Sequence, residues 1–502
     1  MTADGPESRV IGDFEARRPE EGAVRLANYV GGMWRPADGV ATLDDVDPVS
    51  GETTVLVPLS GAVQVRDAVA AARAAQPGWR EVPPQRRARA LLALREGLEA
   101  RREELVALVS ADMGKTLADA DGEVGRGIES VESAAAIPHL LKGETLEGVA
   151  AGVDVEMVRQ PVGVVAAITP FNFPAMIPLW FLPYAIACGN TFLLKPSEQD
   201  PRPATLIMEV VDSIEEIPAG VVNLVHGGRD AVTAILEDPG IDAVSFVGRA
   251  ETARIVAEGA VRTGKRVQAL GGAKNSLVVM PDADLEQAMP AIMGSAFGAA
   301  GQRCLAGSVA VVVGDETRRA EVHQALVSAA SQLGVGPGDD PGTDVCPMVS
   351  ATAREKVAEA IGRAGENGAE LLLDGRGDAG AAGTLLGPTI AVADGESELA
   401  RDELFGPLLT LVEVDDLDAA IEFLNGSRYG NAGAIFTSSG AAARQYRYEA
   451  EAGMLGVNVG VPAPVAWFPF SGWKDSIDGD LHANGTDAVE FYTRKKVVTS
   501  RW

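Results

Sequence analysis

Cysteine is scarce in this sequence, with three residues in a chain of 502. Three thiols cannot form a disulfide framework, so each cysteine needs its own explanation. Histidine is equally rare: the four residues are widely separated, and no HxxxH or CxxC spacing occurs. Because structural metal sites need such clustered ligands, the sequence argues against a bound metal.

Long apolar runs are also missing. The stretch Ala175–Cys188 falls short of the ~18 residues that cross a bilayer, and two prolines interrupt it. The N-terminal segment Met1–Gly22 carries six acidic residues and no apolar core. A signal peptide needs such a core, and a mitochondrial transit peptide is poor in acids. We therefore expect a cytoplasmic protein with a solvated acidic tail over residues 1–25.

Positive charge is in deficit, with 43 Lys and Arg against 71 Asp and Glu and a net charge of −28. This balance disfavours nucleic acid or an anionic membrane as the main partner, although a few local arginines could still bind a small anion. The 46% hydrophobic and 23% charged residues are typical of a globular protein. The length suggests two to four domains.

From residue 162 onward, strand-like and helix-like segments alternate. The strand-like runs are Val162–Ile168, Thr191–Lys195, Val221–Val225, Ala243–Val247 and Val267–Leu270. Helical patterns separate them near residues 175–187, 203–215, 229–237 and 251–262. This rhythm predicts an α/β fold with right-handed crossovers and a parallel sheet. Ligands bind at the carboxyl ends of such strands.

Other segments flank this region. Short strand-like runs occupy residues 23–60, and helical patterns follow at Val63–Ala75 and along five leucines from Leu91 to Leu108. A second region spans residues 271–460. Near the C-terminus, Phe491-Tyr-Thr493 and Val497-Val-Thr499 both have strand-like composition, and a terminal strand usually pairs with its own domain or another subunit.

Cys304 is the first candidate for chemistry. It lies among small residues that leave room for a substrate, and the adjacent Arg303 would lower the pKa of its thiol. A buried, inert thiol is the alternative interpretation, and local context alone leaves both open. Cys188 lies in an apolar run and Cys346 in a loop without a basic neighbour. Since no histidine is paired with Cys304 in the sequence, a papain-like hydrolase is disfavoured.

Two further motifs follow predicted strands. Asn172 could donate to a developing oxyanion, or it could simply form a turn beside a proline. Lys195 and Glu198 could bracket ribose hydroxyls, and a carboxylate there favours NAD over NADP. Surface charges on a loop are the alternative for this pair. No GxGxxG motif follows the predicted strands between residues 162 and 270, so the usual dinucleotide fingerprint is missing there.

Six short motifs together give the chain a resemblance to the aldehyde dehydrogenase superfamily from about residue 27 to the end. They are Thr169-Pro-Phe-Asn-Phe-Pro174, Lys195-Pro-Ser-Glu198, Phe246-Val-Gly248, Leu270-Gly-Gly272, Gly301-Gln-Arg-Cys304 and Glu403-Leu-Phe-Gly-Pro407. The run Phe468-Pro-Phe-Ser-Gly-Trp-Lys474 is most similar to the branch of methylmalonate-semialdehyde dehydrogenases that acylate coenzyme A. The resemblance implies a parallel-sheet NAD-binding domain, an α/β catalytic domain and a small β oligomerisation element.

The resemblance also implies roles for single residues. Cys304 would be the nucleophile, and the Asn172 amide with the Cys304 backbone N–H would hold the oxyanion. Residues matching cofactor-contacting positions are Thr169, Phe171, Lys195, Glu198, Gln199, Arg249, Gly271 and Glu403. At three of these, Gln199, Arg249 and Gly271, the residue type departs from the family pattern, which usually has serine at 249 and, in this branch, threonine at 271. An arginine at 249 could meet the cofactor pyrophosphate or crowd it.

Two acids of the hydrolytic family members are missing. Their water-activating glutamate is replaced by Ala269, and the Gly479-Asp-Leu-His482 segment has no counterpart of their C-terminal glutamate. A general base contributes roughly 10²–10⁴-fold, so water should attack a thioester slowly here. A thiol attacks as its thiolate and needs less help. The missing acids therefore favour coenzyme A as co-substrate.

Two arginines indicate an acidic substrate. Arg303 adjoins Cys304, and Arg126 matches a residue that the branch uses to bind a substrate carboxylate. A guanidinium pairs well with a carboxylate. Helical periodicity alone would instead place Arg126 on a solvated face. The expected reaction is NAD-dependent oxidation and decarboxylation of malonate or methylmalonate semialdehyde to acetyl-CoA or propionyl-CoA.

The expected organisation follows the family. The NAD-binding domain would comprise residues 26–144 and 166–270, the catalytic domain residues 271–460, and the oligomerisation element residues 145–165 and 478–502, in a homotetramer. Two alternatives stay open: a hydrolytic aldehyde dehydrogenase acting on another aldehyde, and a catalytically silent binding protein. The intact Cys304, Asn172, Lys195 and Glu403 argue against the second.

Overall fold

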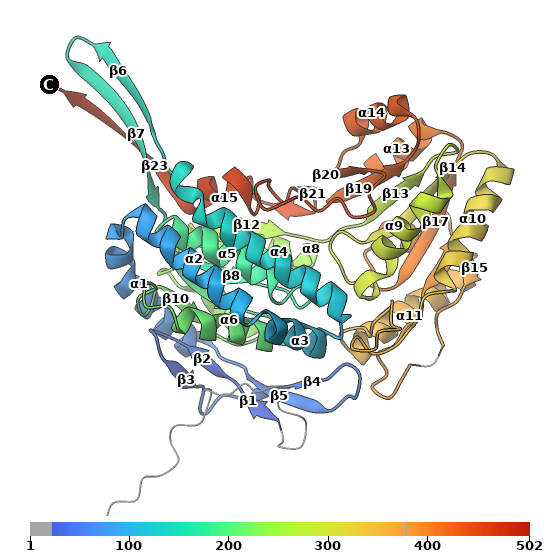
Figure 1. The fold of residues 1–502 in the computed structure, drawn as a ribbon, viewed down its shortest axis with the longest axis horizontal. Helices are drawn as coiled ribbons and strands as arrows, with labels where there is room; N and C mark the ends of the chain where they lie inside the picture. Colours follow the sequence, from blue (N-terminus) through green and yellow to red (C-terminus); the bar gives the residue numbers. More distant parts are fainter. Residues whose placement is uncertain (1–22, 378) are drawn as a thin grey trace, which may run out of the picture.

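The computed structural model describes residues 23–377 and 379–502, so most of the acidic tail expected at residues 1–25 lies outside it. Two α/β lobes lie side by side, and a narrow β arm projects from the far end of the first lobe (Figure 1). The first lobe is built around an eight-stranded sheet and the second around a seven-stranded sheet. In the described part of the chain, no helix has the length and apolar character to cross a membrane.

The first-lobe sheet has the strand order β22-β12-β11-β8-β9-β10-β2-β3. The neighbours from β12 to β10 are parallel, which confirms the α/β organisation expected from the sequence, while β22, β2 and β3 add antiparallel edges. The strands are β2 (Ala27–Tyr29), β3 (Trp34–Pro36), β8 (Val164–Ile168), β9 (Thr191–Lys195), β10 (Val222–Leu224), β11 (Ala243–Val247), β12 (Arg266–Leu270) and β22 (Ile477–Asp478). A small sheet below them contains β1 (Val24–Arg25), β4 (Thr42–Val46) and β5 (Thr53–Pro58).

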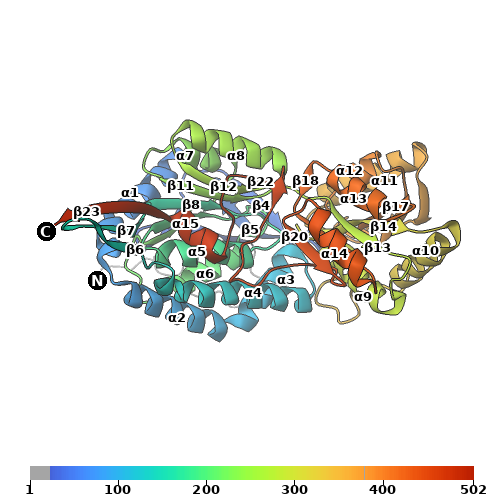
Figure 2. The same cartoon turned by 90° about the horizontal axis from the view of Figure 1, so that it is seen from above.

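Helices cover both faces of this sheet, as Figure 2 shows from above. Alternate residues of β8 point to opposite cores: Val165 and Ala167 to one, Val164 and Ala166 to the other. Burial on both sides explains the continuous apolar runs of these strands. One face carries α2 (Pro84–Ala100), α3 (Arg102–Met113), α4 (Leu117–Ala135), the short η2 (Ile137–His139), α5 (Met176–Ala187), α6 (Arg202–Asp212) and α15 (Gly485–Tyr492). The other carries α1 (Ala62–Glu81), α7 (Arg229–Glu237) and α8 (Ala250–Arg262).

The second-lobe sheet has the order β15-β16-β17-β14-β13-β19-β20, with only β15 antiparallel to its neighbour among the described strands. Its strands are β13 (Asn275–Val279), β14 (Gly307–Val313), β15 (Glu370–Leu373), β16 (Thr389–Val392), β17 (Leu408–Val414), β19 (Ala432–Phe436) and β20 (Met454–Val457). Its helices are α9 (Leu285–Phe297), η3 (Gly298–Gly301), α10 (Glu316–Ala330), α11 (Ala351–Glu366), α12 (Glu398–Arg401), α13 (Leu417–Asn425) and α14 (Gly440–Glu449). A separate pair, β18 (Tyr429–Gly430) and β21 (Trp473–Lys474), lies near the junction of the lobes.

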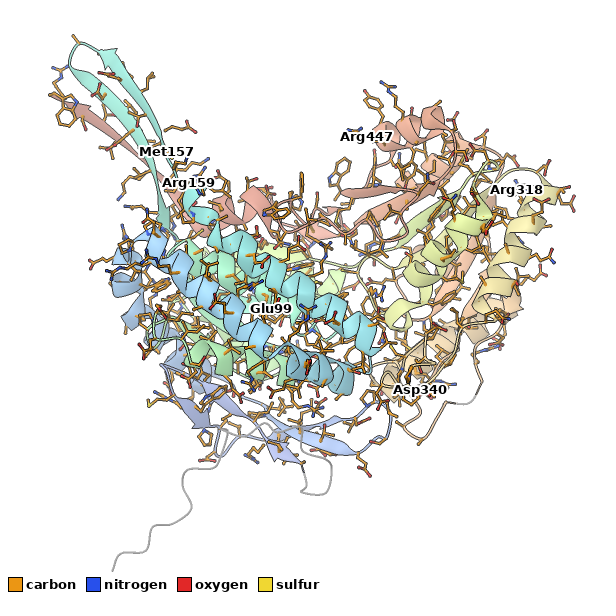
Figure 3. All side chains as sticks on the ribbon, in the orientation of Figure 1. Glu99, Met157, Arg159, Arg318, Asp340 and Arg447 are labelled. Carbon is orange, nitrogen blue, oxygen red and sulfur yellow. The ribbon has the colours of Figure 1, made fainter. Side chains whose placement is uncertain are left out.

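The arm contains β6 (Glu144–Ala150), β7 (Val153–Pro161) and the C-terminal β23 (Thr493–Arg501) in the order β23-β7-β6. β23 pairs antiparallel with β7 along its whole length, from Thr493 opposite Pro161 to Arg501 opposite Val153. The C-terminal strand therefore pairs within its own chain. Side chains project from both faces of the arm, including Met157 and Arg159 (Figure 3).

Two local predictions are wrong. The leucines from Leu91 to Leu108 lie on two helices, because the chain leaves helical geometry at Arg101 (φ −110°, ψ 20°), where the guanidinium pairs with Glu104 and with Glu209 of α6. The aromatic pair at 491–492 ends helix α15 rather than forming a strand, since both rings pack into the first-lobe core, and the strand begins only at Thr493.

Candidate active site

Cys304 lies on the loop between η3 and β14. Three successive residues before it, Ala299, Ala300 and Gly301, adopt left-handed backbone angles with φ of 50°, 53° and 69°. A side chain at Gly301 would place its Cβ 2.2 Å from the Gly406 carbonyl oxygen, so only glycine fits. This small-residue turn explains why the sequence around the thiol has so little bulk.

The Cys304 carbonyl is held by two asparagines. Nδ2 of Asn275, at the start of β13, donates to it at 3.0 Å, and Nδ2 of Asn431 donates at 2.8 Å. The thiol itself is partly buried. Burial and the nearby Glu403 carboxylate raise the pKa of Cys304 to about 12. The free protein therefore holds this sulfur mainly as the thiol at neutral pH.

Asn172 reaches the same loop from the first lobe. It follows β8, and its buried Nδ2 donates to the Gln302 carbonyl oxygen at 3.1 Å. The backbone carbonyl oxygen of Asn172 accepts a 2.6 Å hydrogen bond from Nζ of Lys115. A carboxamide has two N–H donors, so one remains for an oxyanion near Cys304. The structure thus brings together two residues that are 132 positions apart in the sequence.

Beside Cys304 lies a cavity of about 300 Å³. Its wall includes Arg126, Arg303, Phe173 and Trp180 along with the thiol. Six charged side chains line the cavity, three cationic and three acidic, and each cation contacts one acid. The pairs are Lys115 with Glu123 (2.5 Å), Arg126 with Glu129 (2.7 Å) and Arg303 with Asp119 (2.7 Å). The charged side chains that line the cavity therefore sum to zero, and every carboxylate among them is neutralised.

Helix α4 supplies all three acids. Thr116 caps its N-terminus by accepting the Asp119 N–H at 3.1 Å. The following spacings, from Asp119 to Glu123 and Arg126 and on to Glu129, place these side chains along one helical face. That face forms the cavity wall. The helical spacing of these charged residues could suggest a face exposed to solvent, but in the structure the face lines the site.

The two arginines differ in their surroundings. Arg126 also donates from Nη2 to the carbonyls of Ala463 and Pro464, at 3.2 and 3.1 Å. Arg303 donates from Nη1 to the Gly294 carbonyl at 3.3 Å. Its guanidinium lies so close over Gly298 that a Cβ there would meet Nη2 at 2.5 Å. Both guanidinium groups are therefore fixed in place at the cavity wall.

The residues expected to contact a dinucleotide follow the carboxyl ends of four neighbouring parallel strands. Thr169 and Phe171 follow β8, Lys195 ends β9 and is followed by Glu198 and Gln199, Arg249 follows β11, and Gly271 follows β12. Nζ of the buried Lys195 contacts Oε2 of Glu198 at 2.7 Å. Oγ1 of Thr169 is buried without a hydrogen-bond partner among the described residues. An orphaned hydroxyl at this edge fits a polar ligand such as NAD.

Glu403 approaches this edge from the second lobe. Its Oε1 accepts the Ala273 N–H at 2.9 Å, and a Cβ at Gly272 would lie 2.5 Å from Oε2. The ring of Phe405, two residues on, meets Phe171 edge to face with centroids 5.9 Å apart. Burial raises the pKa of Glu403 to about 7. The carboxylate thus lies where the two lobes meet.

The structure explains one of the three departures from the family pattern. At Gly271 a Cβ would lie 2.7 Å from the Asp475 carbonyl oxygen, and the Gly271 N–H donates to the Ser476 carbonyl. The 475–476 segment therefore occupies the space that a threonine would need. Arg249 is exposed, and its side chain makes no hydrogen bond or ion pair with any residue that the structure describes. Its side chain is available to a ligand at this edge.

The structure also shows what occupies the two places where the hydrolytic family members have an acid. Ala269 is fully buried in β12 opposite Phe246 of β11. Asp480 lines a different pocket, beside α8, and His482 contacts Asp487 through Nδ1 at 2.9 Å. Within the described ranges, no cluster of three or more His, Cys, Asp or Glu side chains could hold a metal ion.

Sequence reasoning missed several residues of this site. Asn275 and Asn431, which hold the Cys304 carbonyl, carry no pattern of their own, and Lys115 follows a glycine turn without a recognisable motif. The acids of α4 could have been found, because their spacing repeats every three or four residues around Arg126.

Three comparisons place the chain among known proteins. The model described as "Aldehyde dehydrogenase family" matches residues 34–498. Malonate-semialdehyde dehydrogenase 1 of Geobacillus kaustophilus is 48% identical over 95% of this chain and 98% of that protein. Malonate-semialdehyde dehydrogenase of Pseudomonas aeruginosa is 47% identical over 93% and 94%.

Two solved structures of similar proteins superpose closely on this chain. The crystal structure of methylmalonate-semialdehyde dehydrogenase from Oceanimonas doudoroffii superposes with a TM-score of 0.92 at 41% identity, covering 95% of this chain and 98% of that one. A protein of Sinorhizobium meliloti 1021 that is assigned as methylmalonate-semialdehyde dehydrogenase, complexed with NAD, gives 0.94 at 41%, covering 96% and 99%.

Proposed function

The chain belongs to the aldehyde dehydrogenase family, and we propose that it oxidises malonate or methylmalonate semialdehyde with NAD and transfers the acyl group to coenzyme A. The observation that carries this proposal is the cavity where Cys304 lies beside Arg126 and Arg303. A thiol next to two guanidinium groups suits an aldehyde that also bears a carboxylate. The products are acetyl-CoA or propionyl-CoA, CO₂ and NADH.

The first half of the reaction uses Cys304 and Asn172. The Cys304 thiol gives up its proton to solvent as its sulfur attacks the aldehyde carbon, and the oxyanion accepts hydrogen bonds from the Asn172 side chain and the Cys304 backbone N–H. When bound, NAD would supply the hydride acceptor, and loss of hydride from this adduct would leave a thioester on the Cys304 sulfur. We assign the binding of NAD to Thr169, Phe171, Lys195, Glu198, Gln199, Arg249, Gly271 and Glu403.

Decarboxylation follows from the chemistry of the bound acyl group. Its carboxylate is β to the thioester carbonyl, so the C–C bond breaks with the electron pair moving into the thioester enolate. CO₂ leaves, and the enolate carbon takes up a proton. The coenzyme A thiolate then attacks the carbonyl, and the Cys304 thiolate departs.

The preference for a thiol over water as the acyl acceptor rests on the acids that line the cavity. Asp119, Glu123 and Glu129 each contact a cation, and Ala269 stands where hydrolytic relatives have a base. A carboxylate held by a cation is a weak base for water. This arrangement supports coenzyme A as the acceptor.

Product analysis tests the proposed reaction. The full chain is incubated with NAD, coenzyme A and each semialdehyde in turn, and the products are identified by mass spectrometry. We expect acetyl-CoA from malonate semialdehyde and propionyl-CoA from methylmalonate semialdehyde. Free acetate or propionate as the main product would contradict the acyl transfer.

Replacing Arg126 by alanine tests recognition of the carboxylate. Three hydrogen bonds occupy the Arg126 guanidinium, which leaves two of its five N–H donors for a substrate. Loss of a charged hydrogen bond of about 1.5–3 kcal/mol should raise KM for malonate semialdehyde roughly 10- to 100-fold. KM for propanal, which lacks the carboxylate, should change little.

Arg95→Ala is the matched control, because Arg95 also pairs with a glutamate of α4, Glu132, but on the surface. It should leave both KM values unchanged. If Arg126→Ala raises the two KM values equally, Arg126 supports the loop at 463–464 and does not recognise the carboxylate.

We also propose a cytoplasmic homotetramer. The arm formed by β6, β7 and β23 suits an oligomerisation element, since its long strands extend beyond the first lobe (Figure 1). The proposed NAD-binding domain comprises residues 26–144 and 166–270, and the catalytic domain residues 271–460.

A further inference from the structure

Asn484 is a buried asparagine that lines the same cavity as Cys304 and Arg126. Only 4% of its surface is exposed. Its Oδ1 is buried without a hydrogen-bond partner among the described residues, and its Nδ2 donates to none of them. Buried polar groups almost always have a partner. A side-chain amide that is free at both ends therefore needs an explanation.

The place of Asn484 in the chain would suit a helix cap. It directly precedes α15, and an asparagine there usually accepts a hydrogen bond from an N–H of the first helical turn. Here the side chain makes no such bond. The backbone has φ of 66° and ψ of 178°, a combination that is populated almost only by glycine. The residue is thus strained, and its side chain does not stabilise the helix.

Asn458 shows how the protein accommodates another asparagine with a positive φ, here 56°. Both ends of its amide bind Thr437: Oδ1 accepts the Thr437 N–H at 3.0 Å, and Nδ2 donates to the Thr437 carbonyl oxygen at 3.0 Å. These bonds offset the backbone strain at Asn458. No bond of this kind compensates Asn484, and strain of this sort is typical of binding sites.

Hydrogen bonds place Asn484 near the Arg126 end of the cavity. The next residue, Gly485, donates from its N–H to the Ala466 carbonyl oxygen at 3.2 Å. The Ala466 N–H in turn donates to Oε1 of Glu129, whose Oε2 pairs with Arg126 at 2.7 Å. Helix α15 also packs against α5, which forms another part of the cavity wall (Figure 2).

The end of the Asn484 amide that can reach a ligand is a donor. Oδ1 is sealed from solvent while the residue lines the cavity, so Nδ2 is the accessible end. A semialdehyde carries only acceptors, the aldehyde oxygen and the carboxylate. The aldehyde oxygen is assigned above to Asn172 and the Cys304 backbone, which leaves the carboxylate. It has about four acceptor sites, and the two free N–H groups of Arg126 fill only two of them.

We propose that Asn484 is a specificity-determining residue for the acidic semialdehyde: its Nδ2 donates to the substrate carboxylate beside the Arg126 guanidinium. The inference rests on the proposed function and deepens it by adding an uncharged donor to the carboxylate site. It also explains the strained backbone, which keeps the amide at the cavity instead of at the helix terminus.

The test is steady-state kinetics of Asn484→Gly in the full chain, with NAD, coenzyme A and either malonate semialdehyde or propanal. Glycine adopts the backbone angles of residue 484 without strain, so the variant should fold. We expect KM for malonate semialdehyde to rise about tenfold, the effect of losing one hydrogen bond to a charged group. KM for propanal and KM for coenzyme A should stay within about twofold of the wild type.

Asn458→Gly is the matched control, because it also removes an asparagine amide from a backbone with positive φ. It should leave the ratio of the two aldehyde KM values unchanged. A second measurement uses 3-hydroxypropanoate, which has the carboxylate but no aldehyde, as an inhibitor of propanal oxidation. Its inhibition constant should be about tenfold higher for Asn484→Gly than for the wild type.

Three outcomes would overturn the inference. An equal rise of KM for malonate semialdehyde and propanal would show that Asn484 only shapes the cavity. A rise confined to KM for coenzyme A would place the amide against the co-substrate. Unchanged KM and inhibition constants would show that the amide binds no ligand. Failure of the wild type to oxidise malonate semialdehyde would instead reject the proposed function.

Discussion

Cys304→Ala is expected to abolish NADH formation. The sulfur is the one thiol among the cavity-lining side chains, and we expect it to form the covalent adduct from which hydride leaves. Removing a nucleophile on which every later step depends costs at least about 10³-fold in turnover. Stopped-flow absorbance with malonate semialdehyde, NAD and coenzyme A measures this directly. NADH binding should be retained, because Cys304 is not among the residues assigned to the cofactor.

Cys188→Ala is the matched control for this substitution. Cys188 is also a free thiol, but it is buried in the first-lobe core at the end of α5. Its removal should leave turnover within about twofold of the wild type, with at most a modest loss of stability. Comparable turnover in Cys304→Ala and Cys188→Ala would remove the nucleophile assignment.

Omission of coenzyme A should stop turnover after one cycle. Each subunit is expected to release one NADH in a rapid phase, after which the steady-state rate falls by roughly 10²–10⁴, the usual contribution of a general base. The reason is that all three acids lining the cavity contact cations, and position 269 is alanine. No acid that lines the cavity is therefore free to activate water for attack on the thioester.

The rapid phase and the steady state are both visible by NADH absorbance after mixing with and without coenzyme A. Cysteamine, a small thiol, serves as a control acceptor and should partly restore the rate. Linear NADH production at the same rate in both conditions would indicate hydrolysis and would reject the role given to the paired carboxylates.

The parallel strands could be predicted because they are buried on both faces. The runs at 162–168, 191–195 and 243–247 are mostly apolar, and the structure has a strand within each. Their order in the sheet could not be read from the sequence, because side-chain periodicity carries no information on neighbours. Nor could the helix break at Arg101, which depends on a contact with Glu209 on a distant helix.

Part of the candidate site could also be predicted from the sequence. Cys304, Asn172 and Glu403 lie in motifs that a family resemblance makes visible. The pairing of Arg303 with Asp119 could not be predicted from the sequence, since these residues are 184 positions apart and meet only in the folded chain. The glycine at 271 illustrates the same limit: its cause is the Asp475 carbonyl oxygen, which the sequence places far away.

The central claim is that Cys304 carries the oxidised acyl group until a thiol removes it. The direct test is intact-protein mass spectrometry after mixing with malonate semialdehyde and NAD in the absence of coenzyme A, with the adduct located by peptide mapping. We expect one acetyl or malonyl group per subunit on Cys304, which disappears on addition of coenzyme A as acetyl-CoA forms. An unmodified Cys304 alongside a stoichiometric amount of NADH would contradict this account.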